Sequence, residues 1–281
     1  MLESGTDIIE HYNVLKNERS QFETTWIDIA DDILGLRNFD ISNGLKGQTR
    51  HKHIYDQTGL NWGMLMASMM HGIVTNPGAR FHASQVPKGI RDIGENNDYL
   101  VHIDEVMDGL YKDPKHGFPT AATEWWIDYI FFGTSGMYTA DVAGVGPVDH
   151  ARPLGELVVD EASNGLIDTV YRLSKPTARQ FVQEYGPEAH LPTTKMASGT
   201  QFNMEVPVIH LVHPRSDLNM EFDARGDVRQ MRSVHVVQSD KTIVRESGMA
   251  SDPWQVARYV KEAGEKYGRG PAWMALSDCQ T

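Results

Sequence analysis

Residues 267–281 read YGRGPAWMALSDCQT, and no other stretch of the chain says as much about its fold. An aromatic residue, a Gly-Arg-Gly turn and a proline stand before an apolar run, which is the pattern of a tight turn that opens into a helix. Pro271 has the fixed backbone angle of a first helical turn, and Gly268 and Gly270 allow the sharp turn before it. The sequence stops ten residues after Pro271. We therefore expect a fragment of a larger protein.

The bulk composition is that of an ordinary globular chain. Its 281 residues suggest about two domains. Cys279 is the single cysteine, which excludes an internal disulfide and a cysteine-based zinc site and fits a reducing cytosol. No apolar run approaches the roughly 18 residues of a membrane span, and the first residues lack the pattern of a signal peptide.

The net charge of −12 argues against a protein that clamps nucleic acid through a basic surface, because such binding depends on neutralising phosphates. It does not argue against a wall past which DNA slides with few contacts. A solvated acidic surface that keeps the protein soluble explains the same charge. Both interpretations stay open on composition alone.

Apolar residues at steps of three and four predict helices in the first half of the chain. Gly35, Asn76-Pro77 and Gly133 are stops for three of them. The basic segment 38–53 is predicted to be a surface loop. The expected helices cover residues 6–34, 58–75, 95–112 and 119–133.

The helix over 58–75 is apolar around most of its circumference. Such a helix is buried on several sides or packs between subunits. Methionine suits either place, because its flexible side chain fills irregular gaps. The candidate residues for packing between subunits are Trp62, Met66, Met69 and Met70.

The second half of the chain changes to a β-rich pattern. Asn164-Gly165 between two β-rich runs predicts a hairpin. A helix is expected from Pro176 to Gly186, a loop over 187–205, and a further helix over 254–264. Strands are expected over 137–142, 157–159, 206–212, 234–237 and 242–245. The fold class is therefore α+β.

Motifs for catalysis are absent from the sequence. There is no phosphate-binding G-x-x-x-x-G-K-[ST] loop and no G-x-S-x-G nucleophile motif. His210 and His213 stand three apart in a predicted strand and so face opposite sides. His51 and His53 could share a face, but no carboxylate or cysteine motif accompanies them. We expect no catalytic residue, no cofactor site and no metal site, and hence no enzyme.

Six groups of segments, in order, resemble one family. They are RSQFETTWIDIADDIL, KHIYDQTGLNWGMLMASMMHGIVTNPGARF, FFGTSGMY, RPLGELVVDE with NGLIDTVYRLSKPTARQFVQEYG, PRSDL, and RYVKEAGEKYGRGPAWMALSD. Together they make the chain similar to the portal, or head-to-tail connecting, proteins of short-tailed bacteriophages. The YD-x-TG segment with its downstream TNP, and the YGRGPA turn, are the most specific parts.

The resemblance implies a subunit of a ring, usually of twelve copies, at one vertex of the capsid. The ring would be assembled in the host cytoplasm and carried in the virion, where double-stranded DNA passes through its channel during packaging and ejection. The implied partners are the major capsid protein, the terminase large subunit, and tail adaptor and tail proteins, with no membrane. Residues 1–173 would be the wing, 174–186 the first stem helix region, 187–264 the clip and 265–281 the start of the second stem helix. The remaining wing, tunnel loop and crown would be missing.

Three basic residues are candidates for contact with DNA or the packaging motor: Lys241 and Arg245 in the expected clip, and Arg269 before the second stem helix. Ordinary surface charge or pairing between subunits explains them as well. Two other functions stay open. One is an adaptor or scaffold protein that binds the portal ring, and the other is a DNA-binding or processing enzyme that uses the basic loop 46–53.

Overall fold

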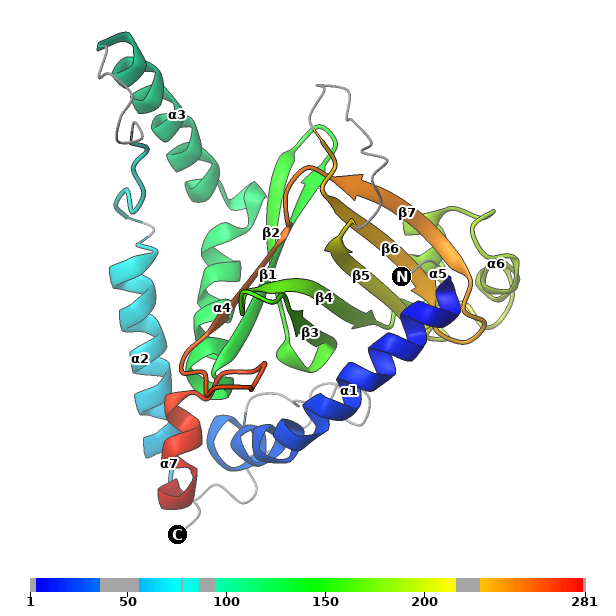
Figure 1. The fold of residues 1–281 in the computed structure, drawn as a ribbon, viewed down its shortest axis with the longest axis horizontal. Coiled ribbons are helices and arrows are strands. Elements are labelled where there is room, and N and C mark those ends of the chain that lie inside the picture. The colour runs from blue at the N-terminus through cyan, green and yellow to red at the C-terminus, as the bar shows by residue number, and fades with distance from the viewer. Residues whose placement is uncertain (1–3, 36–55, 77, 86–93, 216–227, 280–281) are drawn as a thin grey trace.

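The computed structural model describes residues 4–35, 56–76, 78–85, 94–215 and 228–279. Helices and two antiparallel sheets share these residues, which confirms the α+β class. Figure 1 shows α1 running beneath the sheets, with α2 and α3 along one side and α7 beside α2. The predicted surface loop 38–53, with His51 and His53, lies outside the described residues.

The four predicted helices of the first half are confirmed. A capping box between Ser4 and Asp7 opens the first helix. The first helix continues into a π-helical segment that ends at Gly35, where φ is 57°. These elements are α1 (Gly5–Asp28), η1 (Ile29–Leu34), α2 (Thr58–Val74), α3 (Gly94–Lys112), η3 (Pro114–His116) and α4 (Phe118–Phe132).

The strands form a three-stranded sheet of order β2-β1-β8 and a five-stranded sheet of order β3-β4-β5-β6-β7. The predicted hairpin at Asn164-Gly165 joins β3 to β4, with Gly165 at φ 78°. The strands are β1 (Thr134–Val142), β2 (Gly146–Arg152), β3 (Leu157–Glu161), β4 (Ile167–Ser174), β5 (Val208–Pro214), β6 (Met231–Val237), β7 (Ile243–Met249) and β8 (Trp254–Arg258). A short 3-10 turn, η4 (Leu154–Glu156), precedes β3.

Two predictions for the second half are wrong. The segment 254–264 begins as strand β8 instead of a helix, because Trp254 to Arg258 pair with β1, a partner far away in the sequence. The segment 187–205 is not only a loop, since it contains helix α6 (Leu191–Ser198). The helix expected from Pro176 to Gly186 is confirmed as α5 (Ala178–Tyr185), and the C-terminal one as α7 (Pro271–Cys279).

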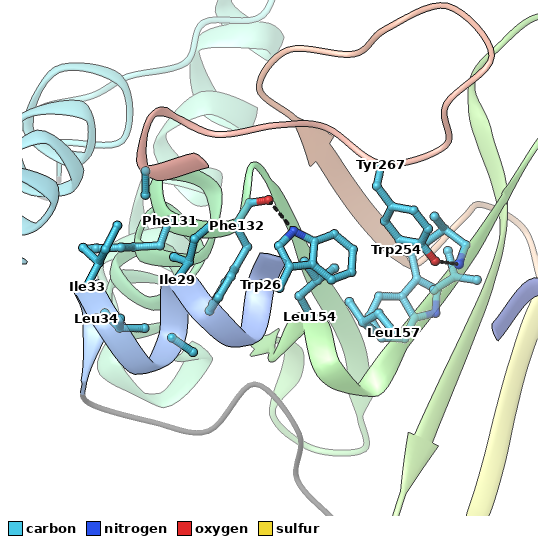
Figure 2. Close-up of a cluster of buried hydrophobic side chains, with 14 of the residues drawn as sticks. Trp26, Ile29, Ile33, Leu34, Phe131, Phe132, Leu154, Leu157, Trp254 and Tyr267 are labelled. Atoms are coloured by element: carbon cyan, nitrogen blue, oxygen red, sulfur yellow. Dashed lines mark hydrogen bonds between the residues drawn. The ribbon is translucent and has the colours of Figure 1, made fainter. Parts of the chain in front are cut away.

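The main core lies where the end of the first helix meets α4, the sheets and α7. Trp26 is fully buried there, and its indole Nε1 donates to the Phe132 carbonyl at 3.1 Å (Figure 2). The Tyr267 hydroxyl accepts from the backbone N–H of Val159 at 3.2 Å. Arg19, the one polar residue on the buried face of α1, is 5% exposed and donates to the Leu157 carbonyl at 2.5 Å. The buried polar groups of Trp26, Tyr267 and Arg19 are therefore partnered by backbone from other elements.

Strand pairing crosses the boundaries expected between wing and clip. β5, β6 and β7, from the segment proposed as clip, complete one sheet with β3 and β4. β8 pairs with β1, from the segment proposed as wing. The division into wing, stem and clip describes positions in a ring and stays a prediction; within one chain these segments share their sheets.

Candidate functional site

The most exposed apolar surface of the described residues lies on α2. Ala67 is the buried residue of this helix, whereas Trp62 is 66% exposed and Ile73 is 74% exposed. The exposed stripe follows helical spacing and consists of Trp62, Leu65, Met69 and Ile73. An apolar stripe of this length is unusual on a surface that faces only water.

This stripe lines a groove of about 620 Å³. One wall is α2, the other is α7 with Pro271, Ala272 and Ala275, and Ile130 and Phe131 of α4 lie between them. All four residues predicted for subunit packing line this groove: Trp62, Met66, Met69 and Met70. Met66 and Met70 also pack against a cluster built on Trp126 and Ile130. The structure thus brings the four candidates together on one surface.

A glycine fixes how closely α2 approaches α4. A Cβ atom on Gly63 would lie within 3.0 Å of the Phe131 ring, so the two helices meet at this point without a side chain between them. The close approach holds α2 against the body by one edge and leaves its opposite edge uncovered by any described element. The glycine has a structural purpose that its place in an apolar helix did not reveal.

The YGRGPA turn is locked against the end of α4. Gly133 ends α4 at φ 76°, and its carbonyl accepts from the Tyr259 N–H at 2.8 Å. The Gly268 N–H donates to the Thr134 hydroxyl at 2.8 Å. A Cβ on Gly133, Gly268 or Gly270 would come closer than 3.0 Å to backbone atoms across this junction. The turn therefore needs its glycines, as the sequence predicted, and the reason is the packing of two backbones.

The three basic candidates lie in different surroundings. Arg269 pairs with Glu262 at 2.9 Å and Glu265 at 2.6 Å, and its guanidinium lies 5.4 Å from the centre of the Trp273 ring. Arg245 donates to the Glu184 carbonyl and lies over the ring of Tyr185 at 4.9 Å. The contacts of Arg269 stabilise the turn before α7, and those of Arg245 stabilise the edge strand β7.

Lys241 is exposed, as Arg245 is, whereas Arg269 is half-buried. Lys241 lies in the turn between β6 and β7 with φ 61°. Its backbone N–H donates to the Val237 carbonyl at 3.0 Å, which closes the turn. The structure does not bring Lys241, Arg245 and Arg269 to one place: the first two lie at β7, and the third lies before α7.

The described residues contain no group of three or more His, Cys, Asp or Glu side chains placed to hold a metal ion. His210 and His213 belong to one strand and have different neighbours, as predicted: the first stacks on His235, while the second pairs in register with Arg232. We also find, over the same part of the chain, no helix with the length and apolar content that a bilayer crossing needs.

Sequence reasoning missed part of this surface. Leu65 and Ile73 belong to the exposed stripe, and the repeat of three and four residues from Trp62 could have identified them. Ala272 and Ala275 form the far wall of the groove. No signal in the sequence pointed to them, because their place depends on how the YGRGPA turn aims α7 at α2.

Comparison with known proteins gives the family of this α+β chain. A family model described as bacteriophage head to tail connecting protein matches residues 6–281. The chain belongs to this family. The resemblance found in its sequence segments is thereby confirmed.

Two curated relatives agree with that assignment. The chain is 25% identical over 278 residues to a probable portal protein of Bordetella phage BPP-1, a match that covers 96% of this chain and 49% of that protein. It is 27% identical over 275 residues to a portal protein of Salmonella phage epsilon15, covering 93% and 48%. The chain spans about half the length of these curated relatives.

Proposed function

We propose that the chain is a portal subunit, which forms with further copies a ring-shaped channel for double-stranded DNA at one capsid vertex. The observation that carries this proposal is the family match over residues 6–281, together with relatives that are portal proteins. The role is structural, and we assign no catalytic residue. The proposed site of action is the head–tail junction of the virion, after assembly in the host cytoplasm.

Packing between subunits is assigned to α2. The stripe of Trp62, Leu65, Met69 and Ile73 offers apolar area that a neighbouring copy would cover, and the groove that it lines offers a concave surface. In a ring each contact joins two different surfaces of adjacent copies and is closed by rotation. A twelve-fold ring is our expectation for the copy number.

The partners follow from the same role. We propose contacts with the major capsid protein, the terminase large subunit, and tail adaptor and tail proteins. Residues 1–173 are proposed as wing, 174–186 as the first stem helix region, 187–264 as clip and 265–281 as the start of the second stem helix. The net charge of −12 suits a channel component that holds DNA loosely.

A test of this proposal is the assembly state of the purified protein. We expect light scattering and negative-stain images to show rings with an axial hole. Replacing Trp62 and Met69 together by glutamate puts two charges into the proposed contact, and we expect at least a tenfold loss of ring at equal protein concentration. Protein that stays monomeric at every concentration would contradict the ring.

Asn61→Glu is the matched control for the ring experiment. Asn61 is exposed on the same helix but does not line the groove. It lies in the first turn of α2, where a negative charge is favourable. We expect this variant to assemble like the wild type. Equal loss of ring in the control and the double variant would remove α2 packing from the proposal while leaving the ring itself intact.

Charge at Lys241 tests the predicted contact with DNA or the motor. We expect Lys241→Glu to reduce packaged DNA about tenfold while rings still form, because charge at the rim of a contact governs association. Lys241→Gln removes the charge without reversing it, and we expect an amount of packaged DNA between those of the wild type and Lys241→Glu. Both variants also replace lysine at a position of positive φ. Lys195→Glu, at an exposed position of α6, is the control. Packaging that is unchanged in Lys241→Glu would identify Lys241 as ordinary surface charge.

A further inference from the structure

A row of basic and titratable side chains crosses the five-stranded sheet in register. Arg172 of β4 pairs with His210 of β5, His210 pairs with His235 of β6, and His235 pairs with Arg245 of β7. Residues opposite one another in antiparallel strands point to the same face. The row therefore lies on one face, and the two imidazole rings stack at 4.0 Å with 9° between their planes.

The three-stranded sheet places a second arginine-bearing row against the first. Tyr138 of β1 pairs with His150 of β2, and two residues along, Gly136 pairs with Arg152. These side chains share a face for the same reason of alternation. The Tyr138 ring meets His210 edge-on, with the ring centres 5.6 Å apart. The two rows thus face each other, and Arg152 comes into the electrostatic range of Arg172 and Tyr138.

The acidic groups in this cluster are fewer than the basic ones. Glu156 is engaged by Arg172, whose Nε donates to it at 2.8 Å. Glu184 contributes its carbonyl oxygen to Arg245, and its carboxylate interacts with Arg152. Three guanidinium groups therefore face two carboxylates. The histidines add no charge at neutral pH, since burial lowers the pKa of His210 well below its usual range and that of His235 to about 3.

Arg152 has a hydrogen-bond donor that lacks an acceptor. Its Nε atom is buried and has no hydrogen-bond partner within the described part of the chain. Burial and the charge of Arg172 lower the pKa of Arg152 to about 10, so the guanidinium still carries its charge at neutral pH. A buried, charged donor without an acceptor is costly, and proteins retain such groups where a charged ligand satisfies them.

We propose that Arg152, Arg172 and Arg245 form a binding site for a phosphate-type oxyanion, between the two sheets and beside the Tyr138 hydroxyl. The guanidinium fork suits tetrahedral oxyanions, which accept several charge-assisted hydrogen bonds from different directions. The three guanidinium groups, which come from three strands, outnumber the two carboxylates that face them. The exposed Arg245 leaves the site open to solvent. This inference does not depend on the portal role.

The first test is the thermal unfolding of the purified protein in phosphate and in chloride at equal ionic strength. At a concentration tenfold or more above the dissociation constant, we expect phosphate to raise the Tm by about 3–6 °C. Titration calorimetry with inorganic phosphate measures the same event directly. A wild-type protein without a Tm shift and without binding heat overturns the proposal.

Two substitutions at Arg152 separate ligand binding from a structural role. Arg152→Met keeps an unbranched, apolar stem and removes the unpaired charge, so we expect a Tm in chloride at least equal to the wild type and no response to phosphate. Arg152→Lys keeps the charge but loses the fork, and we expect a response reduced about tenfold in affinity. A phosphate response that persists in Arg152→Met is a general salt effect and overturns the site. Equal destabilisation by Arg152→Met in both buffers, without a phosphate response in the wild type, identifies an internal partner instead.

A matched control lies on the other face of the same sheet. Arg232 of β6 alternates with the row that contains His235, and it pairs with Glu246 at 2.7 Å. We expect Arg232→Gln to keep the full response to phosphate. A short DNA duplex, followed by fluorescence anisotropy, distinguishes the source of the phosphate: weaker binding by Arg152→Met than by Arg232→Gln indicates a backbone phosphate, and equal binding indicates a free anion.

Discussion

Replacing Gly133 by alanine is expected to destabilise the protein by about 3–5 kcal/mol. Two costs add at this position. Gly133 has φ 76°, a conformation that disfavours any residue with a Cβ atom. That Cβ would also lie closer than 3.0 Å to the backbone of Arg269 and Gly270, which cannot move without opening the turn before α7. Urea unfolding followed by tryptophan fluorescence measures the loss, because Trp26 lies in this core.

Gly144→Ala isolates the backbone part of that cost. Gly144 has φ 81° in the turn between β1 and β2, and a Cβ there would meet nothing within 4 Å. We expect a loss of about 1–2 kcal/mol. If Gly133→Ala proves no less stable than Gly144→Ala, the YGRGPA turn can shift away from α4 at little cost, and the lock described above does not hold.

Acid is expected to destabilise the protein through the stacked histidines. In the folded protein the His235 ring is neutral, because burial and, after it, the charges of Arg245 and Arg172 lower its pKa to about 3. In the unfolded chain His235 takes up a proton near pH 6.5. The unfolded state therefore binds more protons below this pH, and stability falls as pH falls. His235 alone contributes a slope of about 1.4 kcal/mol per pH unit, or roughly 2–3 kcal/mol between pH 6.5 and 4.5.

His235→Gln tests this effect, since glutamine stays neutral and can still bond with the Tyr185 hydroxyl, 2.9 Å from His235 Nδ1. We expect the pH slope of the unfolding free energy to fall by about 1.4 kcal/mol per unit in this range. Burial lowers the pKa of His71, His150, His210 and His213 in the same direction, so part of the slope remains. The control is His102→Gln on the exposed face of α3. An unchanged slope in His235→Gln would mean that His235 is protonated in the folded protein.

Local patterns predicted the helices because their stop signals lie in the sequence itself. Gly35 and Gly133 both have positive φ and both end the helix that the apolar spacing predicted. The Asn164-Gly165 turn is likewise predicted by its own two residues, because Asn-Gly favours a hairpin turn. β8 could not be found this way. Its residues Trp254 to Arg258 become a strand because they form hydrogen bonds with the free edge of β1, and β1 lies far away in the chain.

The candidate site was predictable to the same extent. Spacing and composition identified Trp62 and Met69 on α2, since a helix that is apolar all round is expected to be buried against other elements or subunits. The basic row across the five-stranded sheet was not predictable, because it needs the register of four strands and the pairing of His210 with His235. The histidine nearest to His210 in the sequence is His213, which belongs to the same strand. Register is a property of the sheet, and two residues of one strand contain no information about it.

The locked turn also has a mechanical consequence. The Gly133 carbonyl and Tyr259, the Thr134 hydroxyl and Gly268, and Tyr267 and Val159 connect the segment before α7 to the end of α4 and to both sheets. A pull or a twist applied to α7 is therefore transmitted directly to the strands, without a compliant hinge in between. α7 behaves as a lever rigidly clamped at its base, so any tilting of this helix must carry the whole body of the chain with it.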